Sequence, residues 1–145
     1  MAVIDRLAAW PDSSTEVERR PFDAEAATLF LRAQASWLCR GLRRAGDPIA
    51  VRLVLGSHDA CHGRWLALID QVGHSLRPDL AQQLAELYAL HGRVAGSLER
   101  GVDGRLDPRV ADKVRGLLAA QLSQLTEAAI DRLRLAADAN GPPQR

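Results

Sequence analysis

Apolar residues recur every three or four positions through most of the chain, which predicts amphipathic α-helices. The spacing predicts four of them, over about residues 23–44, 47–73, 78–101 and 107–140. No segment alternates apolar and polar residues as a half-buried strand does. Because the connections are short, successive helices are expected to be antiparallel. The pattern therefore predicts an all-α protein, an antiparallel up-down four-helix bundle over residues 23–140 with a short N-terminal helical arm.

Capping residues and prolines mark the expected helix starts. Asp23, Asp47 and Asp107 can each accept a hydrogen bond from the free amides of a first turn. Pro48 and Pro108 follow two of these residues, at the first helical position where proline is tolerated. The Gly-Pro-Pro sequence at 141–143 is expected to end the last helix.

Residues 1–22 are expected to form the arm and a linker outside the bundle. An amphipathic turn is predicted over residues 2–9, and residues 11–22 are polar without periodicity. Trp10 is interpreted either as a cap on the bundle or as part of a mobile arm that covers a binding groove. The segment has no basic leader followed by a long apolar core, so it does not resemble a signal peptide.

The second, third and fourth helices each carry an apolar stripe that is expected to form the core. The stripe of the second helix comprises Val51, Val54, His58, Cys61, Trp65, Leu68 and Val72. The stripe of the third comprises Leu80, Leu84, Leu87, His91, Val94 and Leu98. The stripe of the fourth comprises Val110, Val114, Leu117, Leu118, Leu122, Leu125, Ala129 and Leu133. Two histidines, His58 and His91, fall at similar heights on neighbouring helices. We expect them to hydrogen-bond each other, so stability should fall as acid protonates them.

The first helix carries two apolar sides, one more than a peripheral bundle helix needs. One side holds Ala26, Leu29, Phe30, Ala33 and Trp37, and the other holds Leu31, Ala35, Leu38, Cys39 and Leu42. Two interpretations fit this pattern. Both sides pack against the rest of the chain, or the second side, with Leu31 and Leu38, receives a partner helix or forms the seam of a homodimer.

The third helix has a strip of very small residues away from its leucine stripe. The strip consists of Ala85, Ala89, Gly92 and Gly96. A glycine inside a helix costs ~1 kcal/mol relative to alanine, so two glycines four residues apart suggest a use. The strip would let another helix approach closely, either one of the protein's own helices or a helix of a partner.

Composition and charge exclude several classes of function. The chain has 145 residues, a formal net charge of +1 and two cysteines, Cys39 and Cys61. This is typical of a single domain in a reducing compartment, and it offers no electrostatic reason to expect nucleic acid or a membrane surface as partner. No apolar run approaches the ~20 residues of a membrane span. We therefore expect a soluble cytoplasmic protein.

Candidate catalytic and metal-binding groups are few. His58 and His62 are four residues apart, as in a zinc site on a helix, with Cys61 beside them. However, no HExxH motif occurs, so core or edge histidines are the preferred interpretation. The chain also has no Gly-rich phosphate loop, GxSxG motif or repeated ExxH pattern. We predict no enzymatic activity, no cofactor and no metal.

Four stretches resemble the flagellin-specific export chaperone family (FliS). Residues 23–31, DAEAATLFL, correspond to the capping residue and apolar run that open the family's first helix. Leu87 and Tyr88 match its Leu-Tyr pair, and residues 101–107 match its short linker. Residues 114–118, VRGLL, match the Val-x-x-Leu-Leu start of its last helix. Helix lengths and order agree over residues 22–130.

This resemblance implies a cytoplasmic chaperone that binds the C-terminal helical segment of flagellin, or of a related secreted subunit, in an apolar groove. Such a protein prevents premature polymerisation and delivers its client to the export apparatus, so a component of the export gate is a possible second partner. The expected groove floor is Leu31, Leu38, Leu66, Ala85, Tyr88, Ala89, Gly92 and Gly96. The alternative is a non-enzymatic regulatory protein that homodimerises through its first helix.

Overall fold

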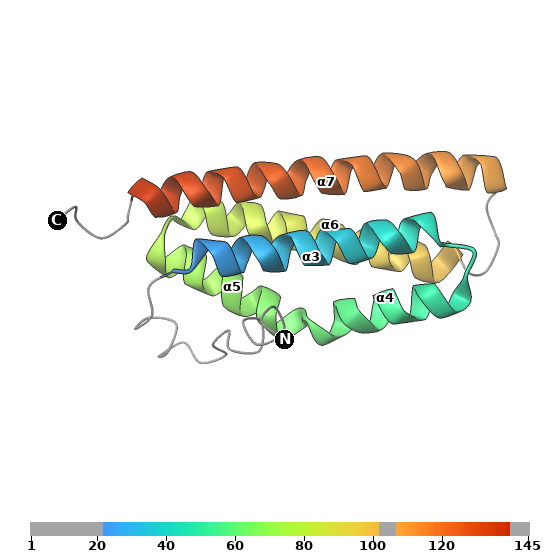
Figure 1. Ribbon diagram of the computed structural model, residues 1–145, viewed down its shortest axis with the longest axis horizontal. Coiled ribbons are helices and arrows are strands. Elements are labelled where there is room, and N and C mark those ends of the chain that lie inside the picture. The colour runs from blue at the N-terminus through green and yellow to red at the C-terminus, as the bar shows by residue number, and fades with distance from the viewer. Residues whose placement is uncertain (1–21, 102–106, 140–145) are drawn as a thin grey trace.

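The computed structural model describes residues 22–101 and 107–139, which form five α-helices and no strand (Figure 1). The helices are α3 (Ala24–Arg43), α4 (Pro48–Ala60), α5 (His62–Ser75), α6 (Pro78–Gly101) and α7 (Pro108–Ala139). The predicted all-α class is confirmed. The predicted N-terminal arm with Trp10, most of the linker before α7 and the predicted terminator at 141–143 lie outside the described residues. Within the described ranges, none of the helices combines the length and apolarity that crossing a bilayer requires.

The predicted aspartate caps are confirmed at three helix starts. The Asp23 carboxylate accepts from the Ala26 amide at 3.0 Å. Asp47 accepts in the same way from two amides of the first turn of α4, and Asp107 accepts from the Arg109 amide at 2.9 Å. Each bond satisfies an amide that has no partner within its own helix.

The predicted second helix is broken at Cys61 into α4 and α5, which corrects the expectation of one continuous helix. The Cys61 amide donates to the carbonyls of both Ser57 and His58, at 3.2 and 3.3 Å, so the last turn of α4 is tightened. The Trp65 amide then donates to the Cys61 carbonyl at 3.0 Å and a new helix begins. This bend lets α4 pack mainly against α3 while α5 packs mainly against α6.

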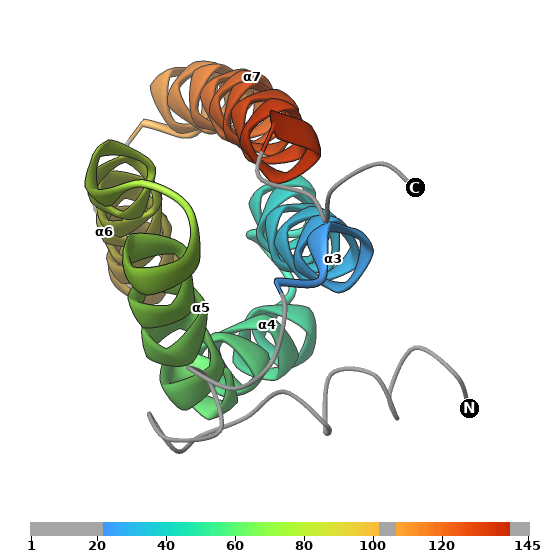
Figure 2. The same cartoon turned by 90° about the vertical axis from the view of Figure 1, so that its left-hand side faces the viewer.

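Helix α7 packs against both α3 and α6. The end-on view shows the helices surrounding a common interior (Figure 2). Contacts along α6 and α7 show that these two helices are antiparallel. Near the start of α6, Asp79 pairs with Arg132 at 3.0 Å, whereas farther along α6 the side chain of Arg93 shares a groove with the earlier residue Leu125.

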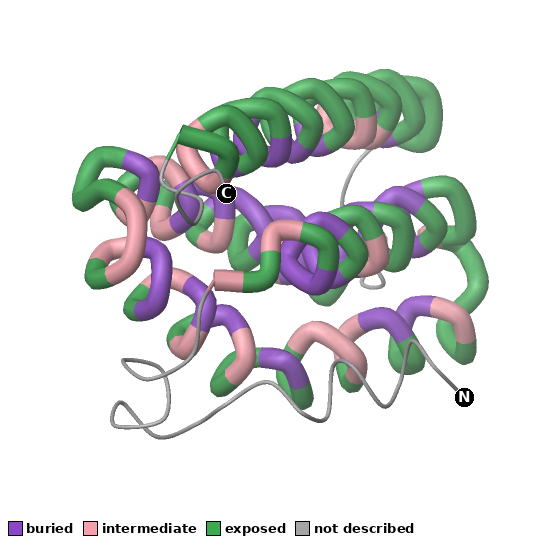
Figure 3. Tube along the Cα trace, turned by 60° about the vertical axis from the view of Figure 1, so that its left-hand side comes forward, coloured by how far each residue is buried: buried purple, intermediate pink, exposed green. Residues whose placement is uncertain are grey.

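Buried residues line the inner sides of the helices (Figure 3) and form two clusters. The larger surrounds Trp65 and joins α3, α5, α6 and α7. The second joins α3, α4, α6 and α7 around Leu38 and Val94. Helix α3 passes very close to its neighbours at Gly41, where an added Cβ would lie 3.0 Å from Leu98 and 3.1 Å from Val54. Glycine at this position allows the close packing.

Polar side chains are enclosed around Trp65. The indole N–H of Trp65 donates to the Gln34 side-chain oxygen at 3.3 Å, and the Gln34 amide donates to the Cys61 sulfur at 3.3 Å. Within the described part of the chain, both ring nitrogens of His91 and Nδ1 of His58 are buried without a hydrogen-bond partner. The predicted His58–His91 hydrogen bond is therefore wrong. Burial lowers the pKa of both imidazoles, that of His91 to about 3.

Candidate functional site

Two of the predicted binding residues belong to the core. Leu31 is 0% and Leu38 is 2% exposed, and they belong to the two separate core clusters. The prediction that they line a docking surface or a homodimer seam is contradicted, because the protein's own helices already cover them. On the other side of α3, Leu29 and Trp37 remain partly exposed.

The other six predicted residues lie along the outer side of α6 and its seam with α5. His62 of α5 contacts Tyr88 of α6, and Gly73 faces Ala81, so the antiparallel register places Leu66 opposite Ala85. The set comprises Leu66, Ala85, Tyr88, Ala89, Gly92 and Gly96, all exposed or half-buried. An added Cβ at Gly92 would meet no atom within 4 Å. In the part of the chain that the structure describes, no neighbouring helix therefore uses the close approach that Gly92 permits.

Tyr88 is fixed in this surface by three aromatic neighbours. Its ring stacks on Trp65 with centroids 4.8 Å apart, and it lies near the rings of His58 and His62. The Tyr88 hydroxyl also hydrogen-bonds Nδ1 of His62. Desolvation by burial raises the pKa of the Tyr88 hydroxyl. The residue therefore offers a rigid, partly apolar edge to the surface.

The apolar stripe of α7 divides into a buried side and an exposed side, which corrects the prediction that all of it is core. Leu122, Ala129 and Leu133 are buried, and Leu118 is half-buried. Four others are between 40% and 67% exposed: Val110, Val114, Leu117 and Leu125. At 100° per residue these four occupy one edge of the stripe, turned away from the core. We call them the α7 stripe.

A groove between α6 and α7 connects the two surfaces. It has a volume of about 360 Å³ and is lined by Gln83, Glu86, Leu87, Ala89, Leu90, Arg93 and Leu125. Ala89 belongs also to the small-residue strip, and Leu125 belongs to the α7 stripe. The exposed side of α6 thus has an apolar residue of α5, Leu66, on one flank and the α7 stripe on the other.

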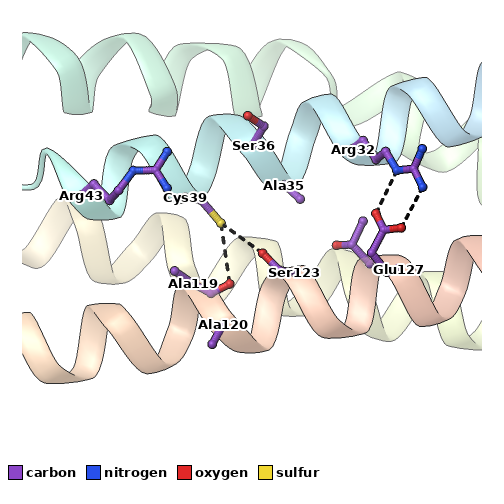
Figure 4. A pocket seen from close by; sticks show the side chains of 10 residues that line it. Arg32, Ala35, Ser36, Cys39, Arg43, Ala119, Ala120, Ser123 and Glu127 are labelled. Carbon is purple, nitrogen blue, oxygen red and sulfur yellow. Dashed lines mark hydrogen bonds and ion pairs between the residues drawn. The ribbon is translucent and has the colours of Figure 1, made fainter.

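A second groove, which was not predicted, runs between α3 and α7 (Figure 4). It has a volume of about 400 Å³, and most of its lining residues are small: Ala35, Ser36, Cys39, Ala119, Ala120, Ser123 and Thr126. The Cys39 sulfur contacts the Ala119 carbonyl at 3.7 Å. Similarly spaced small residues on the two helices were the sequence signal for this groove, but its existence depends on α3 packing beside α7.

An exposed ion pair closes one end of the α3–α7 groove. Arg32 donates twice to the Glu127 carboxylate, at 2.8 and 2.9 Å. This hydrogen bonding lowers the pKa of Glu127 and raises that of Arg32. Because both side chains are about half exposed, solvent screens the pair and its net contribution to stability is small. The pair joins α3 to α7 and places two charged groups at this end of the groove.

Histidines and acidic residues form no metal centre in the described ranges. No three His, Cys, Asp or Glu side chains there converge closely enough to hold an ion. His62, one of the two histidines spaced four residues apart, contacts Tyr88.

Comparisons of the chain with protein-family models, with curated proteins and with solved structures found no match in any of the three. The resemblance to flagellin chaperones therefore depends on the residue pattern alone.

Proposed function

We propose that the protein is a non-enzymatic export chaperone that binds an amphipathic helix of a secreted subunit, with the C-terminal segment of flagellin as the first client to test. The observation that carries this proposal is the exposed α7 stripe beside the apolar α6–α7 groove. Apolar side chains lined up along one helix are the usual docking partners of an amphipathic helix. The resemblance to the flagellin-specific family supports the choice of client, and cytoplasmic binding before export belongs to the same proposal.

The size of the surface sets how a client must bind. Completing the burial of four side chains that are already about half buried contributes roughly 3–6 kcal/mol. Ordering a disordered client helix costs about 2–5 kcal/mol or more. The α7 stripe alone therefore gives little net affinity. A client that also crosses the small-residue strip of α6 toward Leu66 gains close backbone contact and more buried area.

The scaffold proposed for this role is an antiparallel up-down four-helix bundle in which α4 and α5 together form one broken member. The antiparallel contacts of α6 with both α5 and α7 support it. The break at Cys61 turns α5 toward α6, which brings Leu66 beside the small-residue strip.

Titration calorimetry with a flagellin C-terminal segment tests the proposal. We expect a 1:1 complex with a dissociation constant in the micromolar range or below. Leu117→Gln removes an exposed apolar contact and should weaken binding about tenfold, which corresponds to ~1.4 kcal/mol. Leu135→Gln is the matched control, since Leu135 is equally exposed on α7 but lies nearer the other end of the helix.

The control variant should bind like the parent protein. Absence of heat and of any mobility shift at tens of micromolar client would overturn the proposal for flagellin. Equal weakening by both leucine substitutions would show that the client does not use the α7 stripe.

A further inference from the structure

Charge is separated between the two ends of the molecule. One half of the molecule lies toward the end where α3 and α6 finish and where α4 and α7 begin (Figure 1). Its described basic residues are Arg40, Arg43, Arg44, Arg52, Arg93, Arg100, Arg109, Lys113 and Arg115, against the acidic Asp47, Glu99, Asp107 and Asp112. The opposite end has the reverse excess. Its acidic residues are Asp23, Glu25, Asp59, Asp70, Asp79, Glu86, Glu127, Asp131 and Asp138, against Arg32, Arg64, Arg77, Arg132 and Arg134. The small net charge of the chain conceals this polarity.

Three of these basic residues, Arg93, Arg109 and Lys113, lie beside the α7 stripe. Lys113 and Arg109 lie on the solvent side of Val110 and Val114 on the helical wheel. Across the α6–α7 groove, Arg93 lies near Leu125. Within residues 22–101 and 107–139, the structure records no ion pair for these three basic side chains.

Two acidic residues at the start of α7 face other neighbours. Asp112 pairs with Arg115 at 2.6 Å, and both line a shallow pocket with Leu42 on the α3 side of α7. Asp107 caps α7 through the Arg109 amide. Within the described residues, the α7 stripe therefore has Arg109 and Lys113 on one flank and Arg93 on the other, none of them in a recorded ion pair. Glu86 is the one carboxylate that lines the α6–α7 groove with Arg93.

We propose that the helix bound at this surface is an acidic amphipathic helix, with its apolar side on Val110, Val114 and Leu117 and its carboxylates beside Arg93, Arg109 and Lys113. This inference rests on the proposed function and adds the chemical class of the client. The three apolar residues are spaced four and three apart, the spacing at which a second helix interdigitates. Basic flanks steer an acidic partner to the stripe and disfavour a basic one.

The shape of the surface favours a helix over other anionic partners. The apolar stripe is narrow and follows the axis of α7, with α6 beside it, so it fits a rod better than a flat bilayer. A nucleic acid would pair with the basic residues and leave Val110, Val114 and Leu117 exposed to water, since its backbone offers phosphates and not an apolar face.

Fluorescence anisotropy with two designed, labelled helices tests the inference. The helices share one leucine face and differ only in their solvent positions, which are rich in glutamate in one and in lysine in the other. The acidic helix should bind about tenfold more tightly in low salt, because several exposed charge pairs form. This preference should shrink as salt shortens the reach of these interactions.

Charge-reversal variants locate the effect. Arg93→Glu with Lys113→Glu should remove or invert the preference, whereas Arg134→Glu, an exposed arginine on α7 at the acidic end, should preserve it. Circular dichroism confirms that each variant is folded.

Each outcome separates the two proposals. Equal binding of both helices, or an equal effect of Arg134→Glu, overturns the acidic-client inference while helix binding stands. Failure of both helices to bind overturns the helix-binding function together with the inference. Binding to phosphatidylserine vesicles but to neither helix overturns both in favour of a membrane surface.

Discussion

Trp65→Ala is expected to lower the free energy of unfolding by about 3–5 kcal/mol, the usual cost of removing a large buried aromatic side chain. Trp65 is fully buried where four helices meet. Its ring packs edge-on against Phe30 and His91 and stacks on Tyr88, with centroids 4.8–5.4 Å apart. Urea unfolding followed by circular dichroism measures the change.

Two further variants make this test specific. Trp65→Phe keeps an aromatic ring but loses the hydrogen bond to Gln34, so its loss of stability should be smaller. Trp37→Ala removes a tryptophan that is 40% exposed and contacts Arg40, and it should cost no more than about 1 kcal/mol. If Trp37→Ala destabilised the protein as much as Trp65→Ala, the burial pattern described above would be wrong.

Acidification from pH 7.5 to 5 is expected to destabilise the protein by about 2 kcal/mol through His91 alone. Its pKa is lowered to about 3 in the folded state, chiefly by burial and secondly by His58. The unfolded chain, with an ordinary histidine pKa near 6.5, therefore binds the proton first as pH falls. The stability contributed by neutral His91 is complete above pH 6.5 and is lost progressively down to about pH 3. At pH 5, 1.5 units below the unfolded pKa, the loss is about 2 kcal/mol.

His91→Leu should reduce this pH dependence, because the variant has no proton to gain at this site. His74→Gln, which removes an exposed histidine beside Asp70, serves as the matched control and should keep the dependence. Urea midpoints at pH 7.5, 6 and 5 measure the effect. A parent protein equally stable at pH 7.5 and 5 would show that His91 is not enclosed as described.

Much of the fold was predictable from local signals. The aspartate caps at 23, 47 and 107 and the apolar periodicity located the helices to within a few residues. The break at Cys61 was not predictable, because no residue is inserted there and the apolar stripe continues through it. The His58–His91 bond was predicted from their heights along the helices, but within the described residues neither ring nitrogen of His91 has a hydrogen-bond partner.

The candidate site was only partly predictable. Gly92, Gly96 and Leu66 lie outside the core, as expected. Their positions could be recognised in the sequence because the glycines are very small and Leu66 is out of phase with the core stripe. The prediction that Leu31 and Leu38 line a docking surface was wrong, because periodicity does not reveal how many neighbouring helices cover a helix. The α7 stripe was assigned to the core for the same reason. Val110, Val114, Leu117 and Leu125 lie on the edge of the apolar side of α7 that turns away from the neighbouring helices.

The most direct test of helix binding is chemical-shift mapping of the ¹⁵N-labelled 15.8 kDa protein during titration with the flagellin C-terminal segment. The account predicts that the largest saturable shifts fall on α7 between Val110 and Leu125 and on the outer side of α6 between Ala85 and Gly96. Shifts confined to the α3–α4 side, or no shifts at saturating client, would contradict it.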